Sequence, residues 1–342
     1  MKMKNSIKKI ITLLITLVIF VSVLELIGST LIDKESHDEM TKALQESRYE
    51  LSKDPIILFE LGPKSYKRSG SVDVNSYGMV DYEYSILKPK DTMRIVVVGD
   101  SITEGMGVNF NDTYAKVLEK KLNEDGIKTE VLNFGISRYS TIQEIQVLKR
   151  KALLFEPDII VLGYFLNDPI FEDPFINYLK ELTNYETDKK TFELIDAPQE
   201  CWNRLKIKKI IDQSKFLTAL TTKERNVNYT SFYKQIHEDP CTWKTVDYSF
   251  RQLSSISIQK NIPIIITIFP VLEFNNYPFL EIHKQVRDEA EKYKFVVIDL
   301  YDEFFATGKS LRTEPGDNIH PNKQGHKIAA ERIYEKVLVL IQ

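Results

Sequence analysis

The sequence predicts an α/β fold in which helices cover both faces of a parallel sheet. Two observations lead to this prediction. From residue 94 onward, short runs rich in valine and isoleucine alternate with segments whose apolar residues recur at helical spacing. A continuous β-branched run is typical of a strand buried on both faces, and strands that alternate with helices pair in parallel. Overall, 43% of the residues are hydrophobic, a normal share for a globular protein.

Five apolar runs are the predicted strands, at residues 94–98, 129–132, 158–162, 263–269 and 295–300. Helices are predicted between and after them, at residues 114–124, about 142–152, 247–260, 279–293 and about 322–340. In the first of these helices, Ala115, Leu118 and Leu122 form one apolar stripe. We expect right-handed crossovers between the strands.

The alternation of strands and helices is interrupted between residues 169 and 245. This stretch is too long for a connecting loop and therefore predicts an insertion, at about 170–245, with helices of its own. The insertion follows the third strand directly, so we expect it to border any site at that end of the sheet.

The N-terminus is predicted to anchor the chain in a membrane. Four lysines in the first nine positions precede an apolar run at residues 10–24, which Leu26 and Ile27 extend beyond Glu25. Eighteen helical residues span about 27 Å, close to the hydrocarbon core of about 30 Å. Positive flanks stay in the cytoplasm, so residues after 28 are expected on the outer side, in a single-pass arrangement at the cell membrane. A cleaved signal peptide and a buried helix are the alternatives.

The domain organisation follows from this pattern. Residues 1–28 are the predicted cytoplasmic tip and anchor, residues 29–90 a stalk and lead-in that packs on the main domain, and residues 91–342 the main domain with its insertion. Residues 36–51 in the lead-in have the composition of a helix leading away from the membrane.

Charge and cysteine content exclude some classes of protein. The chain has 46 basic and 49 acidic side chains, a net charge of −3, which argues against a nucleic-acid partner. Its two cysteines cannot form a disulfide framework. Cys201 and Cys241 could close one loop in an oxidising compartment or remain two unpaired thiols, and the sequence favours neither.

Polar residues follow the predicted strands where ligands bind in open parallel sheets. Gly99-Asp100-Ser101 follows the first strand, and Asn133-Phe134-Gly135-Ile136-Ser137 follows the second. Asn167-Asp168 follows the third strand, and Asp317-Asn318-Ile319-His320 precedes the last helix.

These residues supply the groups that acyl transfer requires. Ser101 is the predicted nucleophile, His320 the base that takes its proton, and Asp317 the carboxylate that orients the imidazole. The N–H groups of Ser101 and Gly135 and the side-chain amide of Asn167 are the predicted oxyanion donors.

The other polar residues of this region have simpler expected roles. Asp100 and Asp168 are expected to hold loops, Glu104 to be a solvated helix-start residue, and His326 to be a surface or packing histidine. The remaining histidines lack partners at metal-ligand spacing, so neither a metal nor a cofactor is predicted.

These motifs resemble those of the SGNH (GDSL-type) hydrolases. The Gly-Asp-Ser of the first block, the glycine of the second, the Asn-Asp of the third and the Asp-x-x-His of the fifth match in order over residues 93–342. The sequence departs from the family at Phe165, two positions before Asn167, and at Arg138, where glycines are usual. The resemblance implies a three-layer α/β/α sandwich with a five-stranded parallel sheet in the order 2-1-3-4-5.

The resulting hypothesis is a membrane-anchored serine esterase that needs no cofactor. Its expected substrate is an O-acyl ester, with acetyl favoured, on a cell-surface glycan or lipid. The membrane-anchored layout looks like that of bacterial family members associated with cell-surface polysaccharides. One alternative is an O-acyltransferase that modifies a cell-surface polysaccharide, because the same triad serves both reactions. Another is a catalytically inactive binding protein of the cell envelope.

Overall fold

The computed structural model describes residues 48–62, 73–169, 193–201, 203–204, 229–272, 276–307 and 311–342, together with five residues between 16 and 23. The chain divides into two compact units. One comprises Arg48–Ala197 and Asn228–Gln342 and contains the sheet and the candidate site described below. The other comprises Met1–Ser47 and Pro198–Val227, of which few residues are described.

The main unit is built on a five-stranded parallel sheet, which confirms the predicted fold class and the five predicted strands. Its strands are β3 (Met93–Gly99), β4 (Thr129–Gly135), β5 (Ile159–Tyr164), β6 (Ile264–Ile268) and β7 (Val296–Asp299). Their order across the sheet is β4-β3-β5-β6-β7, the 2-1-3-4-5 order that the family resemblance implies. All residues of β5 and β6 are buried, as the β-branched runs predicted.

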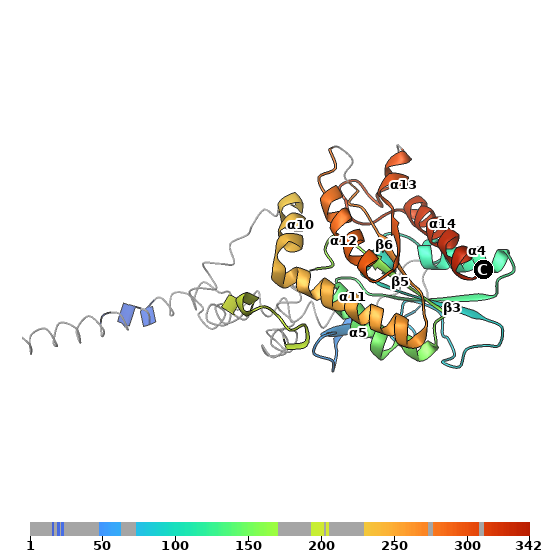
Figure 1. Cartoon of the computed structure of the whole chain (residues 1–342), viewed down its shortest axis with the longest axis horizontal. Helices are drawn as coiled ribbons and strands as arrows, with labels where there is room; N and C mark the ends of the chain where they lie inside the picture. The colour runs from blue at the N-terminus through green and yellow to red at the C-terminus, as the bar shows by residue number, and fades with distance from the viewer. Residues whose placement is uncertain are drawn as a thin grey trace, which may run out of the picture. The chain divides into compact units, whose positions relative to one another are not determined.

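Helices form a layer on each side of this sheet (Figure 1). The helices α5 (Thr141–Arg150), α11 (Pro240–Lys260) and α12 (Leu280–Lys292) pack beside one another in one layer. The helices α4 (Tyr114–Glu124) and α14 (Lys323–Leu340) pack against each other in the second. Right-handed crossovers produce this division, because the chain moves one way from β3 to β4 and the other way through β5, β6 and β7.

Local sequence signals fix where these helices begin. Thr113 accepts a hydrogen bond from the Lys116 N–H at the start of α4, and Asn322 caps α14 in the same way. Asp239 caps α11, and Pro240 occupies its first turn, where a missing N–H costs nothing. The predicted helix at 247–260 therefore begins earlier than expected, at Pro240.

Some elements differ from the predictions. Residues 49–51 form a strand instead of the end of a helix: β1 (Tyr49–Leu51) pairs with β2 (Phe59–Leu61) as an antiparallel hairpin. The lead-in contributes this hairpin because the buried apolar segment at residues 56–61 packs on the main domain. The short helices α3 (Ser101–Glu104) and α13 (Tyr301–Ala306) carried no clear periodic signal. Within the predicted insertion, the structure describes residues 193–201 and 203–204, α10 (Tyr229–Glu238) and the start of α11.

The predicted membrane anchor lies outside the described residues, except for five helical positions: Thr16, Ile19, Phe20, Ser22 and Val23. Within the described part of the chain, no helix combines the length and the apolar character needed to cross a bilayer. Both Cys201 and Cys241 are disulfide-bonded, which answers the question that the sequence left open.

A buried arginine ties the lead-in to the sheet. The Arg94 side chain is fully buried on β3. Its Nε donates to Glu130 Oε2 at 2.7 Å, and its terminal nitrogens donate to the carbonyls of Ser85, Ile86 and Phe155 at 2.6, 2.8 and 3.0 Å. A charge at this depth is stable only because these acceptors replace its hydration.

We therefore expect Arg94→Leu to lower the free energy of unfolding by about 3–5 kcal/mol, because it leaves a carboxylate and three carbonyls without their donor. Urea unfolding measures this loss. Lys120→Leu is the control, because it removes only the exposed Lys120–Glu124 pair and should cost less than about 1 kcal/mol. Equal stability of the two variants would contradict the importance of the buried arginine.

Candidate active site

Three residues predicted from distant parts of the sequence meet at the carboxyl edge of the sheet. Ser101 is the first residue of α3, directly after β3. Its Oγ lies 3.0 Å from His320 Nε2, and His320 Nδ1 lies 2.8 Å from Asp317 Oδ2. The fold thus joins hydroxyl, imidazole and carboxylate in one series of hydrogen bonds.

The Asp317 carboxylate is held by several donors. It accepts the N–H groups of Ile319 and His320 at 2.9 and 3.0 Å and the Thr313 hydroxyl at 3.0 Å. Partial burial alone raises the pKa of Asp317, but the hydrogen bonds from the two N–H groups and from the imidazole outweigh it and lower that pKa. An ionised Asp317 selects the tautomer with the proton on Nδ1, which leaves Nε2 free to accept the Ser101 proton.

The loop that carries His320 is fixed from both sides. The Arg312 guanidinium donates to the Leu272 carbonyl, and the Leu272 N–H donates to the Asn318 carbonyl at 2.7 Å. At the other end, the Asn322 N–H donates to the Leu311 carbonyl at 2.6 Å. These bonds position the imidazole before a substrate arrives.

Three glycines let α3, which carries the predicted nucleophile, approach the sheet. Gly99 pairs in register with Gly135 on one side and Gly163 on the other. A Cβ at Gly135 would lie 2.3 Å from the backbone N of Glu104, and a Cβ at Gly99 would lie 2.0 Å from Thr103 Oγ1. Side chains at these positions would push α3 off the strand ends and displace Ser101.

The three predicted oxyanion donors differ in their partners. The Gly135 N–H donates to Asn133 Oδ1 at 2.9 Å. The Ser101 N–H, in contrast, donates to no acceptor among the described residues. Asn167 is half-buried beside the Asp100 carboxyl, and its Oδ1 has no hydrogen-bond partner in the described part of the chain.

Glu104 also differs from the expectation of a solvated residue. Its side chain is buried, and Oε2 accepts from Arg48 at 2.6 Å and from the Ser137 N–H and hydroxyl at 2.8 and 2.7 Å. Of the two roles expected for His326, surface or packing, the structure shows packing: it is fully buried and stacks on Tyr114.

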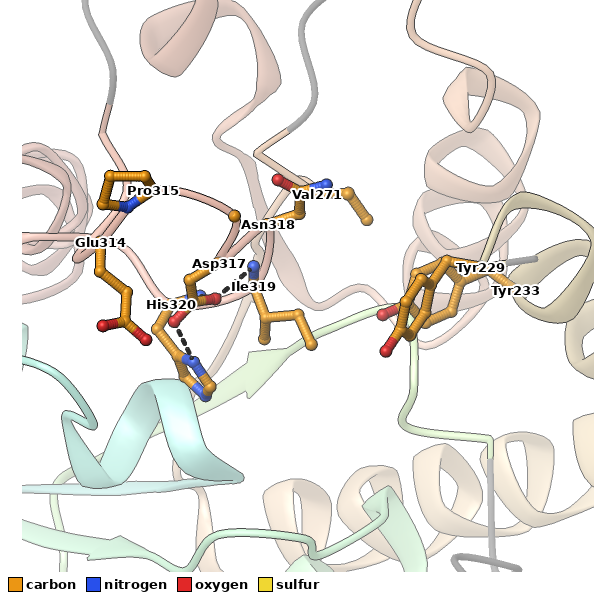
Figure 2. A pocket seen from close by; sticks show the side chains of 10 residues that line it. Tyr229, Tyr233, Val271, Glu314, Pro315, Asp317, Asn318, Ile319 and His320 are labelled. Atoms are coloured by element: carbon orange, nitrogen blue, oxygen red, sulfur yellow. Dashed lines mark hydrogen bonds and ion pairs between the residues drawn. The ribbon is translucent and has the colours of Figure 1, made fainter. Parts of the chain in front are cut away.

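A cavity of about 350 Å³ opens beside His320. The loop 314–320 forms one side, and Val271 and two tyrosines of α10, Tyr229 and Tyr233, contribute the rest. Figure 2 shows both rings projecting from α10 toward the loop that carries Asp317 and His320. The expectation that the insertion borders the site is confirmed for this helix.

A buried histidine holds α10 in place. His237 Nδ1 lies 2.7 Å from the Tyr233 carbonyl, and Nε2 lies 3.0 Å from the Tyr164 hydroxyl at the end of β5. Burial lowers the pKa of His237 to about 4, so the ring is neutral, with Nδ1–H donating and Nε2 accepting. The wall of the cavity is thereby tied to the strand that precedes Asn167.

Three carboxyl groups lie buried behind the site. Asp100 caps α3 by accepting the Ile102 N–H at 2.9 Å, and burial raises its pKa to about 6. Burial and mutual repulsion raise the pKa values of Glu144 and Asp168 well above their ordinary range. Neither carboxyl oxygen of Glu144 has a hydrogen-bond partner among the described residues. Glu144 and Asp168 are therefore neutral in the folded protein at moderate pH, whereas Asp100 titrates near pH 6.

Several functional candidates escaped prediction from the sequence. Tyr229 and Tyr233 are spaced as neighbours on a helix, but nothing marked that helix as a wall of the site. Arg48 and Glu104 carried the signature of surface charges. Only contacts between distant segments distinguish these residues.

We expect Glu144→Gln to reduce the dependence of stability on pH. The unfolded chain ionises Glu144 near pH 4 whereas the folded chain keeps it protonated, so this residue makes stability fall as pH rises from that point. In the native protein, Glu144 should lower the free energy of unfolding by about 1.4 kcal/mol for each pH unit, between pH 5 and 8, over which its carboxyl group stays protonated in the folded state. The Glu144→Gln variant should lack this loss.

Denaturant unfolding at several pH values measures this change. Glu124→Gln, an exposed glutamate of α4, is the control and should leave the pH dependence unaltered. A Glu144→Gln variant with the pH dependence of the native protein would refute a neutral buried acid.

The chain matches a known protein family. The model of the GDSL-like lipase/acylhydrolase family matches residues 97–328. No curated protein sequence matches the chain significantly.

Several solved structures are similar at low identity. The acetyl xylan esterase AlAXEase is 14% identical, with a TM-score of 0.41 over 72% of this chain and 100% of that one. The acetylxylan esterase Axe2 from Geobacillus stearothermophilus is 16% identical, with a TM-score of 0.43 over 72% and 94%. A member of the lipolytic protein G-D-S-L family from Veillonella parvula is 15% identical, with a TM-score of 0.41 over 71% and 97%.

The family match spans about two thirds of the chain and includes Ser101, Asn167 and His320. The chain therefore belongs to the GDSL-like lipase/acylhydrolase family and is an ester-hydrolysing enzyme.

Proposed function

We propose that this protein removes an O-acyl group, with acetyl favoured, from a cell-surface glycan through a Ser101–His320–Asp317 triad. The observation that carries the proposal is the continuous series of hydrogen bonds from the Ser101 hydroxyl to the Asp317 carboxylate. A hydroxyl becomes a nucleophile when a base takes its proton, and this base is already in place.

The triad residues would act in sequence. Ser101 Oγ attacks the ester carbonyl while His320 Nε2 takes its proton, and the imidazolium then protonates the leaving alcohol. Asp317 stabilises the imidazolium by accepting its Nδ1–H. Water, deprotonated by the same imidazole, then releases the acid and restores the serine.

Two donors are proposed for the oxyanion. The Ser101 N–H has no acceptor among the described residues, and the Asn167 amide lies at the end of the neighbouring strand, beside Asp100. Both groups are fixed before the reaction, which is the condition for effective stabilisation of the developing charge. The Gly135 N–H would have to leave Asn133 before it could contribute.

The cavity supports a sugar-linked ester as the substrate. Tyr229 has 61% of its surface exposed at the cavity, whereas Tyr233 beneath it is buried. A flat aromatic surface suits the C–H face of a sugar ring, and the polar groups of Glu314 and Asn318 on the opposite loop suit its hydroxyls.

The location follows from the N-terminal sequence. The lysines before the apolar run support a single-pass anchor with the catalytic domain outside the cytoplasmic membrane. An outward-facing site would meet acylated surface glycans directly.

We expect Ser101→Ala and His320→Ala to lower kcat/KM on a short aryl acetate by about 10⁴-fold or more, because each removes an indispensable step. Asp317→Asn should lower it by about 10³- to 10⁴-fold, since it permits the wrong imidazole tautomer. Ser255→Ala, on the exposed face of α11, is the control and should keep native activity. Native turnover by Ser101→Ala would exclude this serine as the nucleophile.

We expect Tyr229→Ala to raise KM for an acetylated oligosaccharide by about 5- to 10-fold, since roughly 1 kcal/mol of apolar contact is lost. Turnover of a small alkyl acetate should stay unchanged, because it does not reach the ring. Tyr248→Ala, on α11 and away from the cavity lining, is the matched control. An unchanged KM for the oligosaccharide would exclude Tyr229 as a sugar-binding surface.

A further inference from the structure

The segment that precedes the catalytic domain reaches the back of the nucleophile helix. Arg48 is the first residue of the main compact unit and directly precedes β1. Its guanidinium donates to Glu104 Oε2 at 2.6 Å and to Ser137 Oγ at 3.1 Å. The Glu104 side chain is 1% exposed and that of Arg48 is 20% exposed, so water screens this ion pair little.

One oxygen of Glu104 thereby joins three parts of the chain. Besides Arg48, Glu104 Oε2 accepts the N–H and the hydroxyl of Ser137, in the loop that follows β4. The next residue of that loop, Arg138, has a φ of 75°, in the left-handed region that a side chain rarely adopts. The hydrogen bonds to Glu104 help to hold the loop in this conformation.

The hairpin that carries Arg48 is itself attached to the same loop. The Phe59 ring packs edge-on against Tyr49 and Tyr139, with ring centroids 4.9 and 5.2 Å away. The Tyr139 hydroxyl donates to the Phe59 carbonyl at 2.5 Å, and Gln143 Nε2 donates to the Ile57 carbonyl at 2.9 Å. The residues 48–61 therefore form a strap across the loop between β4 and α5.

The length of α3 makes this strap relevant to the site. The helix is a single turn with Ser101 at its first position and Glu104 at its last. Because Glu104 and Ser101 share this turn, we expect a shift of the Glu104 carboxylate to displace the Ser101 hydroxyl as well. Arg48 itself does not line the cavity beside His320.

We propose that Arg48 is a positioning residue. Through Glu104 and Ser137 it fixes α3 and the loop after β4. The contact between the strap and this loop thereby determines the position of Ser101. This inference rests on the proposed function of Ser101. Because Arg48 lies outside the cavity lining, its loss should change kcat and leave KM nearly constant.

The test uses the full chain with Arg48→Ala, Arg48→Lys and Glu104→Gln, and expresses kcat per active site titrated with a fluorophosphonate. Arg48→Ala should lower kcat by about 10- to 100-fold, as expected for a displaced reacting group, with KM within about twofold. Arg48→Lys should recover part of kcat, because the charge is kept but the planar fork is lost. Low-millimolar guanidinium should raise kcat of Arg48→Ala but not of the native protein.

Arg251→Ala is the matched control. Arg251 pairs with Asp247 on the same helix, α11, so its loss should leave the strap in place and kcat native. The positioning role would be overturned if Arg48→Ala had native kcat per active site. If Arg48→Ala does not fold, native kcat in both Arg48→Lys and Glu104→Gln would overturn it instead. A native protein whose turnover does not depend on Ser101 would instead overturn the proposed function itself.

Discussion

The close approach of α3 to three neighbouring strand ends is the constraint on which the site depends. Gly99, Gly135 and Gly163 stand side by side because β4, β3 and β5 pair in that register. None of these glycines has a side chain, so Thr103 and the backbone of Glu104 pack directly against the strand ends. Ser101 then emerges at the carboxyl edge of the sheet, where the loop of His320 can reach it. The fold thereby places the proposed nucleophile with little freedom to move.

Electrostatics then divide the carboxyl groups near the site into two kinds. Asp317 lies near the surface and accepts several N–H and O–H donors, which favour its ionised form. Asp100, Glu144 and Asp168 are buried and repel one another, which favours their neutral forms. One charged carboxylate therefore faces His320 from the loop side. Asp100 also interacts with His320, which lowers the Asp100 pKa, although burial outweighs this effect.

The parts of this arrangement that depend on local sequence were predictable. The β-branched run at residues 94–98 is a strand because both of its faces are buried, and the three-residue spacing of Asp317 and His320 lets one loop hold both groups. The roles of Gly135 and Glu104 were not predictable from local sequence. Gly135 packs against the backbone of Glu104 in α3, and the buried Glu104 carboxylate pairs with Arg48 from the lead-in. Both facts arise from packing between segments, which neither composition nor periodicity contains.

The central claim, that the fold activates Ser101 through His320, is tested most directly by reaction with a fluorophosphonate, followed by peptide mapping of the adduct. The account predicts a single fast adduct on Ser101 of the native full chain, and a rate reduced by about 10³-fold or more in His320→Ala, since an unassisted hydroxyl is a poor nucleophile. An adduct on another serine, or an undiminished rate without His320, would contradict it.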